Sequence, residues 1–137
     1  MSVVKELIKV ADNGGLSFGN FELEQKTKKS DFEFKGDIYK VKTFKDITRL
    51  EKNELFVYES EPGTAVSDFV MKEDGVEFVV EGPETAQVIV GLEESTNYDV
   101  YIDGVQVDKL TTNLGGKLAV NVELGSKPVK VRIVKEG

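Results

Sequence analysis

From residue 64 to the end of the chain, apolar and polar residues alternate in short runs separated by turn-forming residues. A period of two is typical of strands that bury one face, and turns at this spacing are typical of a sandwich or barrel. Seven strands are predicted here, over residues 65–72, 76–81, 86–91, 97–102, 105–110, 117–123 and 129–135. The pattern therefore predicts an all-β protein, an antiparallel β-sandwich of immunoglobulin-like or jelly-roll-like type.

The two runs within residues 97–110 meet at Asp103-Gly104, a pair that suits the two-residue type I′ turn of a β-hairpin. This turn places four pairs of residues opposite each other: Ile102 and Val105, Tyr101 and Gln106, Val100 and Val107, and Asp99 and Asp108. One face of the hairpin is then aliphatic and the other is polar. A slip of one residue would turn aspartates toward the core, so we expect this register to be specific.

Residues 1–63 are less regular. Short apolar runs separated by glycine-containing turns predict further strands there, and six of the eight phenylalanines lie before residue 60. Residues 44–53 fit both helical and strand spacing, and we favour strand. The length of 137 residues suits one domain. We expect a single β domain over 1–137, in which strands of 1–63 pack on the sandwich of 64–137 as part of one core, or are exchanged between copies.

The chain contains neither histidine nor cysteine. This composition excludes Ser-His-Asp and Cys-His catalytic sites, histidine-bearing zinc sites and disulfides. A carboxylate pair, a lysine, a tyrosine or the N-terminal amine would need a strongly shifted pKa to act as an acid or base at pH 7. We therefore expect a protein that is not an enzyme and that holds no cofactor and no metal.

The formal net charge is −7, and the excess of acidic residues lies entirely in residues 61–137. Binding of phosphate backbones requires clustered cations, so nucleic acid is not an expected partner. The one basic cluster evident along the sequence, Lys26, Lys28 and Lys29, is interleaved with acidic residues. We expect a solvated strand end or loop there rather than an anion site.

No apolar run approaches the roughly 18 residues of a membrane span, so no membrane partner is expected. The first ten residues mix charged and apolar side chains and do not form the apolar segment of a secretory signal. As written, the sequence predicts a cytoplasmic location, with a trimmed signal or another export route as the alternatives.

Residues 91–100, which contain a leucine, a short loop and Tyr98, resemble the E–F corner of fibronectin type III and related immunoglobulin-like modules. The resemblance implies that the Tyr98 hydroxyl bonds back to the backbone and closes this corner. Residues 76–135 also look like the accessory β-sandwich modules of polysaccharide-degrading enzymes. This second resemblance implies the architecture and no particular activity.

The whole chain also resembles small bacterial proteins labelled endosialidase, through residues 16–19, 39–43 and 56–60. That label implies cleavage of sialic acid polymers. Sialidases bind the sugar carboxylate through three arginines, and their Asp-box repeats contain tryptophan. This chain has only Arg49 and Arg132 and has no tryptophan, so it lacks the residues for that chemistry.

The polar face of the predicted hairpin holds the candidate ligand surface: Tyr101, Gln106, Asp99 and Asp108. Tyr101 beside Gln106 offers a ring on which a sugar can stack. The two aspartates would lie about 5 Å apart, a separation similar to that of the carboxyls of retaining glycosidases. The alternative is an exposed pair that is screened by water and Lys109.

Three functions are compatible with these features. The favoured one is a non-catalytic interaction or structural module that self-associates into a homo-oligomer, because an open sandwich leaves edge strands that must be protected or paired. The second is a carbohydrate-binding accessory module that uses Tyr101. The third is a glycan-cleaving enzyme that uses Asp99 and Asp108.

Overall fold

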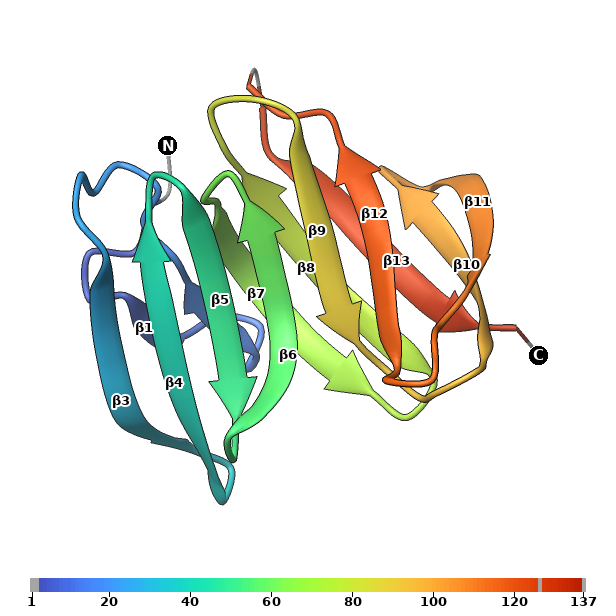
Figure 1. Cartoon of the computed structure of the whole chain (residues 1–137), viewed down its shortest axis with the longest axis horizontal. Coiled ribbons are helices and arrows are strands. Elements are labelled where there is room, and N and C mark those ends of the chain that lie inside the picture. Colours follow the sequence, from blue (N-terminus) through green and yellow to red (C-terminus); the bar gives the residue numbers. More distant parts are fainter. Residues whose placement is uncertain (1–2, 126, 137) are drawn as a thin grey trace.

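The structure, a computed structural model, describes residues 3–125 and 127–136. This part of the chain folds into thirteen strands and contains no helix. The strands are β1 (Ile8–Val10), β2 (Leu16–Phe18), β3 (Thr27–Phe34), β4 (Asp37–Phe44), β5 (Ile47–Lys52), β6 (Leu55–Glu61), β7 (Ala65–Lys72), β8 (Gly75–Glu81), β9 (Ala86–Gly91), β10 (Asn97–Ile102), β11 (Val105–Thr111), β12 (Lys117–Val122) and β13 (Val129–Lys135). They form two sheets in one sandwich (Figure 1). The described residues therefore include no helix that is long and apolar enough to cross a membrane.

The prediction of an all-β antiparallel sandwich is confirmed, because every strand pairing in both sheets is antiparallel. All seven strands predicted after residue 64 are present, and β7, β9, β10 and β13 have the predicted bounds. Residues 47–52 form strand β5, so strand was the right choice between the two patterns that this segment fits.

Both sheets combine strands from the two parts of the chain (Figure 1). The seven-stranded sheet has the order β1-β2-β7-β8-β13-β10-β11, and the six-stranded sheet has the order β12-β9-β6-β5-β4-β3. Strands before residue 63 therefore extend both layers, through the pairing of β2 with β7 and of β6 with β9. The four edges of the sandwich are β1, β11, β12 and β3.

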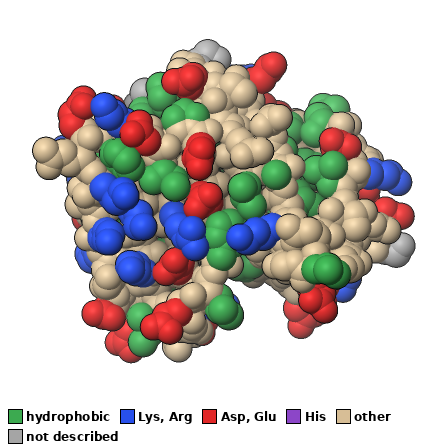
Figure 2. Space-filling view, viewed as in Figure 1, with side chains coloured by type: hydrophobic (Ala, Val, Ile, Leu, Met, Phe, Trp, Pro, Cys, Tyr) green, Lys and Arg blue, Asp and Glu red, His purple; other side chains and the backbone are tan. Residues whose placement is uncertain are grey.

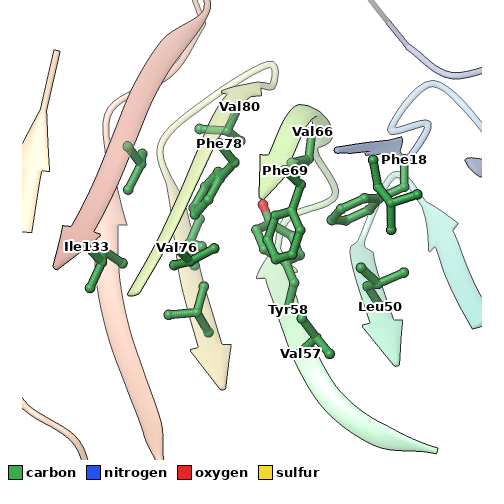
Figure 3. Packing of buried hydrophobic residues seen from close by; sticks show 14 of the residues in the cluster. Phe18, Leu50, Val57, Tyr58, Val66, Phe69, Val76, Phe78, Val80 and Ile133 are labelled. Carbon is green, nitrogen blue, oxygen red and sulfur yellow. The ribbon is translucent and has the colours of Figure 1, made fainter. Parts of the chain in front are cut away.

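Aromatic rings from both parts of the chain meet between the sheets (Figure 3). Phe18 lies 5.2 Å from Tyr58 and 5.4 Å from Phe69, and Tyr58 lies 5.6 Å from Phe78, measured between ring centroids and with near-perpendicular ring planes. Edge-to-face pairs of this kind add to the stabilisation from burial alone. The phenylalanine-rich first part thus contributes to the same core as the later strands, as expected.

The β10–β11 hairpin confirms the predicted turn and corrects part of the predicted register. Asp103 and Gly104 have φ of 50° and 85°, the positive values that a type I′ turn requires. Ile102 pairs with Val105 and Tyr101 with Gln106, as expected. A β-bulge then leaves Val107 without a partner, so Val100 lies opposite Asp108 and Asp99 lies opposite Lys109.

The predicted pairs Val100–Val107 and Asp99–Asp108 are therefore wrong, for a physical reason. A register is enforced where a slip would expose apolar residues that the core buries. Strand β11 is an edge strand whose Val107 is 54% exposed, so little burial depends on its register. The bulge also replaces a repulsive Asp–Asp pair with an Asp–Lys pair.

Candidate functional site

The structure brings together three of the four residues of the predicted ligand surface. Tyr101 lies opposite Gln106, and the Gln106 side chain donates a hydrogen bond from Nε2 to Oδ1 of Asp99, over 3.2 Å. The guanidinium of Arg132, on the neighbouring strand β13, lies 4.2 Å from the centroid of the Tyr101 ring. One face of this ring is therefore covered by a cation, which leaves less of the ring for stacking on a sugar.

The fourth residue, Asp108, does not join them. It lies opposite Val100, whose side chain is buried between the sheets, so Asp108 is on the other side of the sheet from Asp99. The Asp108 carboxylate instead accepts a hydrogen bond from the backbone amide of Lys109 at 2.8 Å. The two carboxyls do not form the facing pair on which the glycosidase hypothesis depended.

Tyr98 has the structural role that its resemblance implied. Its side chain is buried, and its hydroxyl accepts a hydrogen bond from the backbone amide of Glu93 at 3.2 Å. Thr112 braces the same corner, because its hydroxyl donates to the Glu93 carbonyl and accepts from the Thr96 amide. The corner is therefore closed by side-chain hydrogen bonds to the backbone.

A buried network of hydroxyl groups, which the hydropathy pattern did not predict, lies between the sheets near β6. The Thr64 hydroxyl is 2.8 Å from the Tyr58 hydroxyl and 2.7 Å from the Ser60 hydroxyl. Thr48 bonds to both the carbonyl and the amide of Thr64, and it is 2.8 Å from the Thr43 hydroxyl. No buried polar side-chain atom in the described part of the chain lacks a partner.

This network satisfies the hydrogen bonds of polar groups that are buried between the sheets. Burial raises the pKa of Tyr58 far above its ordinary value of 10.0, and the hydrogen bonds from Thr64 and Ser60 only partly oppose that rise. Tyr58 is therefore neutral at physiological pH. No histidine exists to activate a hydroxyl. The signal in the sequence was the set of Thr43, Thr48 and Ser60 on the consecutive strands β4, β5 and β6, with Thr64 in the loop after β6. Periodicity alone does not distinguish these buried hydroxyls from exposed ones.

Four lysines gather on the outer surface of the six-stranded sheet, where Figure 2 shows a group of cationic side chains over β3, β4 and β5. We call Lys26, Lys28, Lys40 and Lys42 the lysine face. Lys28 lies opposite Lys42, and Lys42 lies opposite Arg49, so three cations form a row across three strands. Lys26 and Lys28 were predicted from the sequence as a solvated cluster, and both are exposed. Lys40 and Lys42 were not predicted to join them, because only the pairing of β3 with β4 brings the four close.

No described carboxylate lies within ion-pair distance of the lysine face, although Glu51 lies opposite Lys40 in the β4–β5 pairing. None of its four side chains makes an ion pair with a described residue, whereas Arg49 contacts Glu59 at 3.0 Å and Glu51 at 3.2 Å. The pKa of Lys42 is lowered, first by partial burial and then by repulsion from the surrounding cations, Lys28 foremost. The surface thus carries positive potential although the whole chain is acidic.

The second distinctive surface is the free edge of β12 and the groove beside it. Strand β12 pairs with β9 in an uninterrupted register, and its other edge has no partner strand in the described structure. Beside it lies a groove of about 560 Å³ that is lined by both apolar and polar residues. The apolar lining residues are Ile102, Val107, Val122, Leu124 and Val129, and the charged ones are Asp103, Glu123 and Lys127.

Comparison with known proteins adds no functional information. Neither the family models, nor the curated proteins, nor the solved structures that were compared with the chain match it. Among the described residues, no three acidic side chains are arranged to hold a metal ion. We base our proposals on the geometry of the β12 edge and of the lysine face.

Proposed function

We propose that this protein is a non-catalytic interaction module that self-associates by adding a strand from a second copy to the free edge of β12. The observation that carries the proposal is the unprotected state of this edge. Unpaired amides and carbonyls along an edge strand are a template for another strand. Strand β12 presents six residues in regular register, and no charged side chain lies between Leu118 and Val122.

The other three edges carry features that oppose pairing. Strand β1 has only three residues. Strand β11 is bulged and bears Asp108 and Lys109, and β3 is bulged after Lys29. Short edge strands, bulges and edge charges are the means by which natural sheets avoid pairing with other chains. Strand β12 is longer than β1, has no bulge, and carries a charge only at its first residue, Lys117, which favours this strand as the contact.

The groove beside β12 also favours this strand as the contact between copies. A strand that pairs with β12 would cover the groove, and its inward side chains would contact Val107 and Val122. Val107 is 54% exposed, so much of its apolar side chain is available for an added strand to cover. Burial of the apolar lining residues adds apolar contact to the backbone hydrogen bonds of the added strand.

The test is the solution mass of the wild-type protein and two variants, measured by size-exclusion chromatography with light scattering over a wide concentration range. We expect a discrete multimer of the 15.2 kDa chain. Val107→Glu places a charge in the lining of the groove and should shift the protein toward monomer. Val105→Glu is the matched control, because Val105 is 64% exposed on the same strand and does not line the groove.

A wild-type protein that is monomeric at every concentration would contradict the proposal. The proposal would also be wrong if both variants weakened the multimer equally, because the contact would then involve the hairpin in general and not the groove.

A further inference from the structure

The lysine face has the geometry of a regular array of cations. Neighbouring strands lie about 4.8 Å apart, and alternate residues on one strand are about 6.7 Å apart. Lys28 and Lys42 are neighbours across β3 and β4, and Lys40 and Lys42 are alternate residues on β4. An extended polymer that bears anionic groups at comparable intervals can therefore contact several of these lysines at once.

The lysine face keeps its charge although the protein is rich in carboxylates. Some cations elsewhere form ion pairs: Lys72 with Glu77, Lys135 with Glu93 and Lys52 with Asp37. What distinguishes the lysine face is that its lysines lie next to one another across β3 and β4, with Glu51 as the acidic residue opposite Lys40. The four lysines of the lysine face have no such partner among the described residues, and the pKa of Lys42 is lowered in part by its cationic neighbours. The net charge of −7 does not cancel this local field, because salt screens charges beyond about 10 Å at 0.1 M.

The aromatic residues nearby argue against nucleic acid as the polymer. Proteins that bind single-stranded nucleic acid stack its bases on free rings. Here Lys26 lies 5.9 Å from the centroid of the Phe44 ring, and Arg49 and Lys117 lie 5.4 Å and 4.7 Å from that of Phe56. Both rings already have cations over them. The lysine face is therefore expected to recognise a polymer by its charge, without stacking of bases.

We propose that the lysine face is a binding surface for a linear anionic polysaccharide, whose carboxylate or sulfate groups contact Lys26, Lys28, Lys40 and Lys42. The inference is independent of self-association, because the lysine face does not include β12 or the groove. It also assigns carbohydrate binding to a different surface from Tyr101, whose ring is covered by Arg132.

The first experiment measures binding of the full chain to heparin as the sulfated polymer and to polygalacturonate as the carboxylated one, with neutral dextran and poly(dT) for comparison. Each cationic contact with a flexible polyanion lowers the slope of log K against log salt by about 0.7. Four contacts therefore predict a loss of affinity of about 50-fold between 50 and 200 mM salt. The preferred polysaccharide identifies the anionic group. Failure to bind either one, or tighter binding of poly(dT), would overturn the proposal.

The second experiment compares two triple variants with the same net charge. Lys28→Gln/Lys40→Gln/Lys42→Gln removes most of the lysine face, whereas Lys9→Gln/Lys109→Gln/Lys130→Gln removes three exposed lysines from strands of the seven-stranded sheet. We expect the first variant to lose on the order of 100-fold in affinity at 50 mM salt, given the contribution of a lysine near an anionic surface. Its salt dependence should fall to about threefold over the same range.

Equal losses in the two variants would show that net charge, not the lysine face, controls binding, and would contradict the proposal. The solution mass separates this inference from self-association. If the first variant changed the mass of the multimer, the lysine face would be a contact between copies, and its assignment as a polysaccharide site would be wrong.

Discussion

The two edge strands of the six-stranded sheet differ in how well they are protected against pairing with another strand. Strand β3 is interrupted by a bulge, holds Asp31 at a φ of 60° and carries two lysines. Strand β12 has no bulge, and its central residues are uncharged. Both belong to one sheet of one sandwich, so the fold alone does not make an edge available. Bulges and charges determine which edge remains free to pair.

The packing between the two sheets also differs between these regions, and it is less complete beside β12. Toward β5 and β6 the space between the sheets is filled by interlocking rings and by a network of hydroxyls in which each buried group has a partner. Beside β12 it opens into the groove. We therefore predict that substitutions in the hydroxyl network change stability, whereas substitutions at the β12 edge change association.

The largest expected effect is that of Thr64→Val. The substitution removes the hydroxyl that contacts both Tyr58 and Ser60, and it leaves two buried hydroxyls without that partner. Each unsatisfied group costs about 1–3 kcal/mol, so we expect a loss of about 3 kcal/mol in the free energy of unfolding, measured by urea denaturation. Thr85→Val, at an exposed position, is the control and should change stability by less than about 0.5 kcal/mol. Similar costs at the two positions would show that the network does not stabilise the fold.

A smaller effect, on self-association, is expected when β12 is given charged side chains like those of β3. Ala119→Lys/Asn121→Lys adds two charges at exposed positions on this edge strand. Lysines on an edge strand oppose the addition of another strand, and we expect the dissociation constant to rise about tenfold, which corresponds to about 1.4 kcal/mol. Sedimentation velocity measures the shift, and urea denaturation checks that the fold is intact. An unchanged dissociation constant would count against β12 as the contact.

The smallest effect concerns the paired charges of the seven-stranded sheet. The hydrogen bond from Lys72 lowers the pKa of Glu77 below its ordinary value of 4.5. A carboxyl with a lowered pKa in the folded state stabilises the protein above the unfolded pKa, and this contribution is lost as the pH falls through the folded pKa. The free energy of unfolding of wild type should therefore be higher than that of Glu77→Gln at pH 7. The difference should be less than about 1 kcal/mol, because the ion pair is partly exposed.

The difference in unfolding free energy between wild type and Glu77→Gln should shrink as the pH is lowered from neutrality through the ordinary pKa of 4.5 and then through the lower pKa of the folded state. A constant difference over that range would show that the ion pair does not contribute to stability.

The sequence predicted the elements of this fold well where burial enforces them. Strand β13 alternates Val129, Val131 and Ile133 with polar neighbours, and the structure buries these three side chains. The Asp103-Gly104 turn was predicted because few residue pairs adopt two positive φ angles. Periodicity did not predict the bulge at Val107, since an exposed edge strand imposes no pattern on its residues.

The candidate surfaces were less predictable than the fold. Lys28 and Lys42 are distant in the sequence, and the β3–β4 register makes them neighbours. Arg132 covers Tyr101 because β13 lies beside β10. These two strands are not consecutive in the sequence. Such surfaces depend on which strands pair, and local alternation does not specify that.

The most direct test of self-association through β12 is amide hydrogen exchange at this strand in wild type and in Val107→Glu at the same protein concentration. A strand added to β12 protects amides of residues 117–122 that are otherwise open to solvent. We predict slower exchange at β12 in wild type than in the variant, with equal rates in the two proteins at the β3 and β11 edges. Equal rates at β12, or a difference confined to β11, would contradict this prediction.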